Sequence, residues 1–244
     1  MEQTSEFVLF GPAHVTTLIA IALTCVAVAA LTRGRPSRRV DYGIAAGLIV
    51  QEVLKLYFYI GVVDLPWQTN LPLHLCRINE LLCVVMLVTR SYRVFEVSYF
   101  LAMSGSVSAM LTPALTGGFP GAEFPLFFFG HGLVVIAVVY AIAAYGFEPR
   151  PRSLLVALGA TGLYALLIAP INLLLDANYL FLRAPPEPDT VLSLLGPWPV
   201  YLFALLGLAI TVCVLAYLPF GLVRWWRRRR GSREPGRGSR PGRL

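Results

Sequence analysis

Residues 70–80 read NLPLHLCRINE and place a run of polar and ionisable side chains inside an otherwise apolar segment. Such groups are costly in hydrocarbon, so the run indicates a functional site if the segment lies in a membrane. The alternative is that these groups only hold helices together. The side chains concerned are His74, Cys76, Arg77, Asn79 and Glu80.

The composition of the chain indicates that the segment does lie in a membrane. Of the 244 residues, 57% are hydrophobic and 14% are charged, whereas soluble domains have about 25% charged residues. The mean hydropathy is +0.70. Because so few polar residues cannot cover a soluble surface, we expect an all-α, polytopic membrane protein.

The positive charge and the cysteines exclude other classes of protein. The net charge of +7 is concentrated from Arg224 onward, directly after a hydrophobic run, which is typical of a cytoplasmic membrane flank. No basic patch alternates with aromatic residues, so nucleic acid is not an expected partner. The four cysteines show no paired spacing, so we expect neither a disulfide framework nor a zinc knuckle. We also expect no cofactor.

Seven segments are long enough to cross a hydrocarbon core, which takes about 20 apolar residues. We therefore predict a domain of seven transmembrane helices over residues 1–226. The Arg-, Gly- and Pro-rich residues 227–244 are expected to form a disordered, basic cytoplasmic tail. The segments lie at about residues 12–32, 40–62, 71–89, 94–112, 125–146, 153–176 and 199–223.

Arginines occupy every second loop, as the positive-inside rule describes for cytoplasmic loops. The pattern predicts that the N-terminus lies outside and the C-terminus inside the cell (plasma) membrane. The arginine-bearing loops are residues 33–39, 90–93 and 150–152, whereas residues 63–70 and 113–124 have no Lys or Arg and residues 177–198 have only Arg183.

With this orientation, polar residues of several spans share a depth about 8–9 Å below the outer surface, counted at about 1.5 Å per helical residue. Phospholipid glycerol esters lie at this depth. Glu52 and Lys55 are three residues apart and can form an ion pair, and Arg77 could pair with Glu80 in the same way or bind a lipid phosphate. The expected supporting layer consists of His14, Glu52, Lys55, Asn79, Glu80 and Asp176.

Cys76 is the candidate nucleophile in this layer. His74 is two residues away and would lie on another face of a regular helix, so the base should come from another segment. His131 follows Gly130 at matching depth. A cysteine with a base in reach is the signature of covalent acyl transfer, and either a base or a helix N-terminus is needed to form the thiolate.

Four motifs also resemble a known family. The chain reads LPLHLC at 71–76, FGHG at 129–132, N-x5-NYLFL at 172–182 and LGPWP at 195–199. These motifs resemble the transmembrane protein 164 family with its bacterial YwaF-type members, and the resemblance covers nearly the whole chain. It implies an acyltransferase with Cys76 as catalytic cysteine, because the mammalian member makes arachidonoyl ether phospholipids through a cysteine in the matching motif. Since bacteria rarely use arachidonate, the resemblance does not fix the fatty acid or the acceptor.

The leading hypothesis is therefore a lipid acyltransferase acting on phospholipid and lysophospholipid substrates. Cys76 would attack a lipid ester and hold the acyl group as a thioester, and His131 would move protons. Further side chains would bind substrate or stabilise the oxyanion. The residues expected in that role are His74, Arg77, Asn172, Asn178 and Trp198.

Two other functions stay open. One is a seven-helix lipid hydrolase, either metal-dependent with His14, His74 and His131 as ligands, or of the threonine–histidine type that the chain resembles distantly. The other is a receptor or small-solute transporter whose polar layer binds a ligand. A retinal protein is disfavoured, because the only lysine is Lys55 in the second segment.

Overall fold

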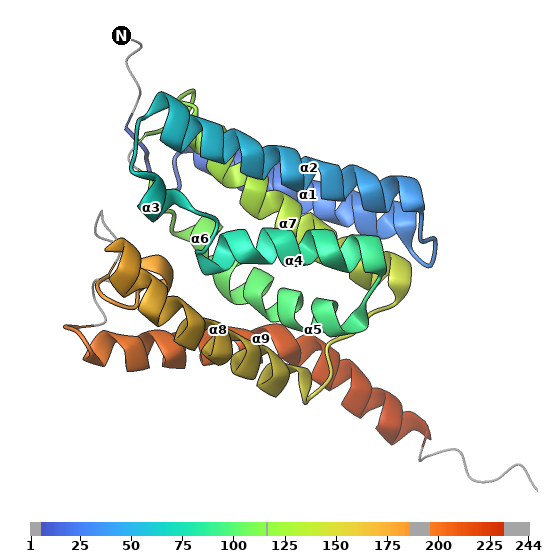
Figure 1. Ribbon diagram of the computed structural model, residues 1–244. Helices are drawn as coiled ribbons and strands as arrows, with labels where there is room; N and C mark the ends of the chain where they lie inside the picture. The colour runs from blue at the N-terminus through green and yellow to red at the C-terminus, as the bar shows by residue number, and fades with distance from the viewer. Residues whose placement is uncertain (1–5, 116, 186–195, 232–244) are drawn as a thin grey trace, which may run out of the picture.

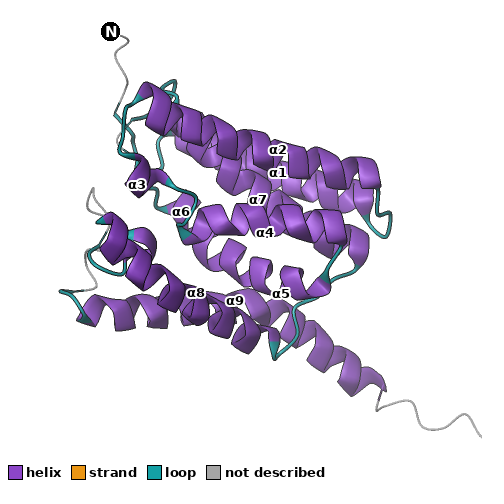
Figure 2. Ribbon diagram, in the orientation of Figure 1, coloured by secondary structure: helices purple, strands orange, loops and turns teal. Residues whose placement is uncertain are grey.

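The computed structural model describes residues 6–115, 117–185 and 196–231, and in these ranges it contains helices and no β-strand (Figures 1 and 2). The all-α prediction is confirmed. The helices are α1 (Pro12–Thr32), α2 (Arg38–Leu56) continued by the π-helix η1 (Tyr57–Val62), α3 (Trp67–Asn70), α4 (Leu75–Thr89), α5 (Tyr92–Leu101) continued by the π-helix η2 (Ala102–Val107) and by α6 (Ser108–Leu111), α7 (Glu123–Tyr145), α8 (Ser153–Leu175), the short η3 (Tyr179–Phe181) and α9 (Val200–Gly231).

Six helices of the described chain are long and apolar enough to cross a membrane. They match six of the seven expected segments and make this a multi-pass membrane protein. Helix length and composition do not test the predicted seventh span. They also do not test the predicted sides of the membrane for the N-terminus and the C-terminus. The six helices are Pro12–Thr32, Arg38–Val62, Tyr92–Leu111, Glu123–Tyr145, Ser153–Leu175 and Val200–Arg229.

The segment expected at 71–89 is helical only from Leu75, so α4 has 15 residues. At about 1.5 Å per residue it is about 22 Å long, whereas a hydrocarbon core is about 30 Å thick. Its late start has a local cause, because the residue before a proline avoids the helical region. Leu71, before Pro72, is extended with ψ 155°, and His74 is still extended with ψ 147°.

Helix α7 is the centre of the bundle. It packs against α1, α2, α4 and η2, while α8 packs on α5 (Figure 1). Its inward face carries small residues such as Gly132, Ala137 and Ala141, all buried. A Cβ at Gly132 would lie 3.1 Å from the Ile21 side chain. Small residues allow helix backbones in lipid to approach closely, so α7 can accept neighbours on several sides.

Large apolar side chains cover the outer faces of α8 and α9. Leu166 and Leu174 of α8 are 73% and 83% exposed, and Phe203 of α9 is 74% exposed. A helix that is hydrophobic all round requires burial in protein or in lipid. These faces are therefore the ones that lipid chains would cover.

Helix α9 extends beyond the expected end of the last segment. It continues to Gly231, so residues 227–231 are helical and do not belong to a disordered tail. Arginine is a good helix former, and Arg229 stacks on the Trp225 ring one turn earlier, 3.9 Å from its centroid. The rest of the expected tail, residues 232–244, lies outside the described residues.

A buried carboxylate joins three helices at the end of the bundle that carries the arginine loops. Asp41 of α2 is fully buried. Its Oδ2 accepts hydrogen bonds of 2.9 and 2.7 Å from Arg90, after α4. Its Oδ1 accepts bonds of 2.8 and 2.6 Å from the hydroxyls of Tyr140 and Tyr145 of α7. The Asp41 bonds raise the pKa of the Arg90 guanidinium.

Labelling of loop cysteines tests the predicted orientation. Ala122 and Pro151 are exposed residues at opposite ends of α7. In intact cells an impermeant maleimide should label Ala122→Cys, whereas Pro151→Cys should react only after permeabilisation. The parent protein with its four native cysteines gives the background. The opposite labelling pattern would place the arginine loops outside and contradict the prediction.

Candidate active site

Four buried charged side chains connect α2 with α4. Arg77 Nε donates to Glu52 Oε1 at 2.9 Å, and its Nη2 binds the same oxygen. Lys55 Nζ lies 3.3 Å from Glu52 Oε2 and 2.6 Å from Glu80 Oε1. The side chains are at most 12% exposed. We call Arg77, Glu52, Lys55 and Glu80 the charge chain.

The expected Glu52–Lys55 pair is confirmed, but the expected Arg77–Glu80 pair is wrong. Arg77 turns towards α2 because Glu52 offers an acceptor there. Its Nη1 also donates to the carbonyl oxygens of Asn70 at 2.6 Å and Leu71 at 3.4 Å. With all three guanidinium nitrogens bonded, Arg77 holds the chain before α4 in place. The charge chain contains two acids and two bases, so its charges balance.

Gly130 brings α7 against the charge chain. A Cβ at this position would lie 2.5 Å from Gln51 Nε2 and 3.0 Å from Glu80 Oε1. Gln51, which sequence reasoning did not single out, donates to the Leu126 carbonyl at 2.6 Å and so ties α2 to α7. The next residue along α7 is His131.

Cys76 is the second residue of α4, not a residue one and a half turns into a helix as the sequence suggested. No described residue accepts a hydrogen bond from the backbone N–H groups of Leu75, Cys76 or Arg77. The N-terminal end of a helix carries partial positive charge and stabilises a thiolate. Cys76 is partly buried. Pro72 was the signal from which this late helix start could have been predicted.

The Cys76 sulfur faces the π-helix η2. A Cβ built on Gly105 would lie 3.3 Å from Cys76 Sγ, and nothing else lies within 4 Å of that position. Neighbouring Ser106 is buried, and its hydroxyl has no hydrogen-bond partner among the described residues. Single π-turns are frequent at functional sites. The proximity of these small residues to Cys76 depends on helix packing and was not predicted from the sequence.

His131 is held in a tautomer suited to a base. Its Nδ1 lies 2.8 Å from the Phe127 carbonyl oxygen, which can only accept, so Nδ1 carries the proton of the neutral ring. Nε2 is then an acceptor, and no described residue hydrogen-bonds to it. No hydrogen bond in the described chain joins Cys76 to His131, so the expected direct pair is absent in this state.

His74 lies in an aromatic cage formed by the loop after α8. Its ring centroid is 5.1 Å from that of Tyr179 and 5.3 Å from that of Phe181. The Tyr179 hydroxyl accepts a 3.0 Å hydrogen bond from the Leu71 N–H and donates to the Gln68 carbonyl. His74 therefore contacts the segment that positions the start of α4.

Asn172 holds Tyr179 in this position. Its Nδ2 donates to the Tyr179 carbonyl at 2.9 Å, and its Oδ1 accepts from the Tyr179 N–H at 2.7 Å. Asn172 is buried. Its amide thus serves the backbone of one loop residue, and no described hydrogen bond joins it to Cys76.

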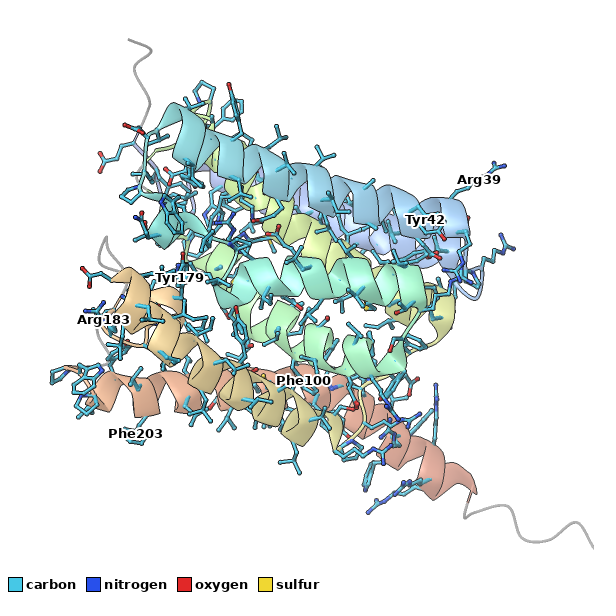
Figure 3. All side chains as sticks on the ribbon, in the orientation of Figure 1. Arg39, Tyr42, Phe100, Tyr179, Arg183 and Phe203 are labelled. Carbon is cyan, nitrogen blue, oxygen red and sulfur yellow. The ribbon has the colours of Figure 1, made fainter. Side chains whose placement is uncertain are left out.

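The side chains of Asn178 and Trp198, the remaining residues expected to bind substrate, also form hydrogen bonds with backbone carbonyls. Asn178 Nδ2 donates to the Ala184 carbonyl at 2.8 Å, and Trp198 Nε1 donates to the Leu182 carbonyl at 3.1 Å. Figure 3 shows Tyr179 and Arg183 at one end of the bundle, and Arg39 and Tyr42 at the other. In the described part of the chain, neither Asn178 nor Trp198 hydrogen-bonds to Cys76 or to the charge chain.

Two members of the expected polar layer lie elsewhere. Asp176 ends α8, has a 91% exposed side chain and pairs with Arg183 at 2.8 Å. His14 is buried, but its Nδ1 accepts from the Phe10 N–H at 3.0 Å and its Nε2 lies 2.8 Å from the Met110 carbonyl. The equal depth expected from the sequence did not bring these residues together, because Asp176 points outward and His14 points towards α6.

Asn79 has a packing role. Its Nδ2 donates to the Ser98 carbonyl at 3.3 Å, joining α4 to α5. The three-histidine metal site is not formed, because both ring nitrogens of His14 bind backbone groups. Among the described residues, no three His, Cys, Asp or Glu side chains are grouped so that they could hold a metal ion.

The helices and the buried charge chain together define an α-helical, multi-pass membrane protein with a polar site inside the bundle. The sequence model of the TMEM164 family matches residues 9–217, and the chain belongs to this family. The resemblance seen in the motifs is thereby confirmed. Neither the curated proteins nor the solved structures contain a match to the chain.

Substitutions in the charge chain should reveal its pairing. Lys55→Met should lower stability by about 3–5 kcal/mol, because it leaves an uncompensated buried carboxylate. Adding Glu80→Gln should restore most of the loss, since the Arg77–Glu52 pair then remains neutral. Thermal unfolding of the protein in detergent measures both effects.

The matched control combines Lys55→Met with Glu52→Gln. It also restores the charge balance, but it leaves Arg77 and Glu80 buried without the partners they have now. It should recover less stability than the combination with Glu80→Gln. Equal recovery by the two double variants would contradict the pairing described above.

Proposed function

We propose that this protein is a membrane-embedded lipid acyltransferase in which Cys76 carries the acyl group as a thioester. The observation that carries the proposal is the position of Cys76 in the first turn of α4, beside backbone N–H groups that no described residue binds. The partial positive charge of a helix N-terminus favours the thiolate form of a sulfur placed there. Membership of the TMEM164 family, matched over residues 9–217, supports the membrane-embedded location of the site.

In the first half-reaction His131 Nε2 accepts the Cys76 thiol proton. The sulfur then attacks the carbonyl carbon of a phospholipid ester and forms a C–S bond. The ester C–O bond breaks, and the leaving oxygen takes the proton from His131, which releases a lysophospholipid. The Nδ1 bond to Phe127 supports this role because it fixes the ring and leaves Nε2 as acceptor.

The oxyanion formed during this step needs hydrogen-bond donors. The sequence suggested the side chains of Asn172, Asn178 or Arg77, but these are bonded to other groups. The backbone N–H groups of Cys76 and Arg77 are better candidates, because a helix N-terminus presents preorganised donors to developing negative charge. These N–H groups belong to Cys76 and to the residue after it, so their position relative to the sulfur is fixed by the helix backbone.

In the second half-reaction a lysophospholipid hydroxyl attacks the thioester carbonyl. Its proton passes to His131, the C–S bond breaks, and the protonated histidine returns the proton to Cys76. Water in place of this hydroxyl would give hydrolysis. The acceptor thus decides between transfer and hydrolysis, and both use the same acyl-enzyme.

The proposal includes the membrane arrangement. We infer seven membrane-embedded helices in the plasma membrane, with α4 as the short one, the N-terminus outside and the C-terminus inside. Cys76 then opens towards the outer leaflet, where ester groups lie. The arginine-bearing loops, which favour the cytoplasmic side, support this orientation.

Intact-mass spectrometry of the purified protein tests the acyl-enzyme directly. Incubation with a defined phospholipid should add the mass of one fatty acyl group, removable by neutral hydroxylamine. Cys76→Ala should abolish both the adduct and the transfer. His131→Ala should slow adduct formation by about 10²–10⁴-fold, the usual contribution of a general base.

Two controls make this experiment specific. Cys83→Ala removes a fully buried core thiol and should keep the adduct. His74→Ala should be less damaging than His131→Ala, since the His74 ring packs on the rings of Tyr179 and Phe181 and has no hydrogen-bond partner among the described residues. The mechanism would be contradicted by an adduct that persists in Cys76→Ala, or by an unchanged rate of adduct formation in His131→Ala.

Gly105 offers a second test of the site. A methyl group there would approach Cys76 Sγ to 3.3 Å, in the space that the acyl carbonyl needs, so Gly105→Ala should slow adduct formation at least about tenfold. The matched control is Gly159→Ala in α8, whose Cβ would meet nothing within 4 Å. It should leave the rate unchanged. Equal rates of adduct formation in the two variants would contradict the placement of Gly105 beside the reacting acyl group.

A further inference from the structure

A second polar site lies at the opposite end of the bundle from Cys76. A cavity of about 320 Å³ opens between the start of α5, the loop joining α7 to α8, and α9. Tyr92 and Phe147 form aromatic walls, their rings packed edge to face at 5.5 Å. Arg150, Arg224 and Glu148 supply the charged groups of the lining. The proposed acyl transfer uses none of these residues.

Arg150 is exposed, and its charge has no opposite partner among the described residues. Its guanidinium lies 4.4 Å above the centre of the Tyr92 ring. Among the described residues it has no carboxylate within ion-pair distance and no hydrogen-bond acceptor. A planar cation stacked on an aromatic ring keeps its edge free, and that edge binds phosphate in a bidentate manner.

A buried hydrogen-bond network supports the Tyr92 ring and the Arg150 backbone. Ser153 is fully buried, accepts a 3.1 Å hydrogen bond from the Arg150 N–H, and donates to Glu96 Oε2 at 2.7 Å. The Tyr92 hydroxyl donates to the Glu148 carbonyl at 3.0 Å and lies 3.3 Å from Ser153 Oγ. Glu96 is buried as well. The network fixes both the ring and the backbone that carry the Arg150 cation.

Positive charge exceeds negative charge around the cavity. Arg224 Nη2 donates to the Pro149 carbonyl at 3.2 Å and lies 3.9 Å from Glu148 Oε2, while Arg227 lies 3.8 Å from Glu148 Oε1. At these distances neither arginine hydrogen-bonds to Glu148. Two arginines and one carboxylate line the cavity, and the Arg224–Glu148 ion pair is long.

We propose that this cavity binds a phosphate group, with Arg150 and Arg224 as its ligands. The cavity occurs where the apolar surface of α9 gives way to arginines, and the half-exposed Trp225 beside Arg224 is typical of a membrane interface. An anionic phospholipid headgroup presents its phosphate at that level. Glu148 opposes the bound anion and limits its affinity.

Native mass spectrometry of the full chain in detergent tests the site. The probes are phosphatidylglycerol and diacylglycerol, which lacks the phosphate. The wild-type protein should retain phosphatidylglycerol and not diacylglycerol. The double variant Arg150→Gln/Arg224→Gln should bind phosphatidylglycerol about tenfold more weakly, because it loses charge-assisted hydrogen bonds. Unfolding without added lipid shows that the variant is folded.

The matched control is Arg35→Gln/Arg39→Gln, which removes the same charge from another arginine loop at the same end. It should bind phosphatidylglycerol as the wild type does. An equal loss in the control would show diffuse attraction to a basic surface and overturn the proposal. Competition by inorganic phosphate at similar concentration would support the site and identify a free phosphate as its ligand.

Glu148→Gln gives an independent readout that does not depend on the arginine variants. Removing the opposing carboxylate should tighten phosphatidylglycerol binding several-fold. If Glu148 only positions Arg224 and Arg227, its loss should weaken binding instead. Weaker or unchanged binding in this variant would contradict the phosphate site.

Discussion

Four charged side chains inside an apolar bundle place the strictest condition on this fold. A buried charge without its partner is strongly destabilising, so α2 and α4 must meet in the one register that joins Arg77 to Glu52 and Lys55 to Glu80. That register holds Arg77 in the first turn of α4, and therefore its neighbour Cys76 there too. Gly130 completes the arrangement, because only a residue without a side chain lets α7 approach Glu80. Cys76 and His131 thus take their places from the pairing of the charges.

The length of the apolar runs made most of the fold predictable. The first helix has the expected bounds, Pro12–Thr32, and the others differ by a few residues, except that α9 ends eight residues later than expected. Runs of about 20 apolar residues in lipid allow little besides helix. The late start of α4 was missed because mean hydropathy carries no information on the backbone conformation that Pro72 imposes on Leu71. The extra length of α9 was missed because the consecutive arginines were interpreted as a charged, disordered tail, although arginine also favours helix.

The candidate site was predictable only in part. The Glu52–Lys55 pair followed from spacing on one helix, whereas the partner of Arg77 lies on another helix and depends on packing. Depth in the membrane grouped His14 and Asp176 with Cys76, but depth does not tell which way a side chain points. The asparagines at 172 and 178 looked like oxyanion donors. Both hold the backbone of the loop after α8, a use that no spacing rule reveals.

The shortness of α4 has a consequence for the lipid around it. A helix of 15 residues falls about 8 Å short of a hydrocarbon core of about 30 Å. A bilayer next to such an element relieves the mismatch by becoming thinner locally. In the proposed orientation the missing length is on the outer side, above Cys76. Lipid headgroups would sink towards the sulfur there, so that the deformed bilayer, and not a moving loop, would deliver the ester bond to the nucleophile.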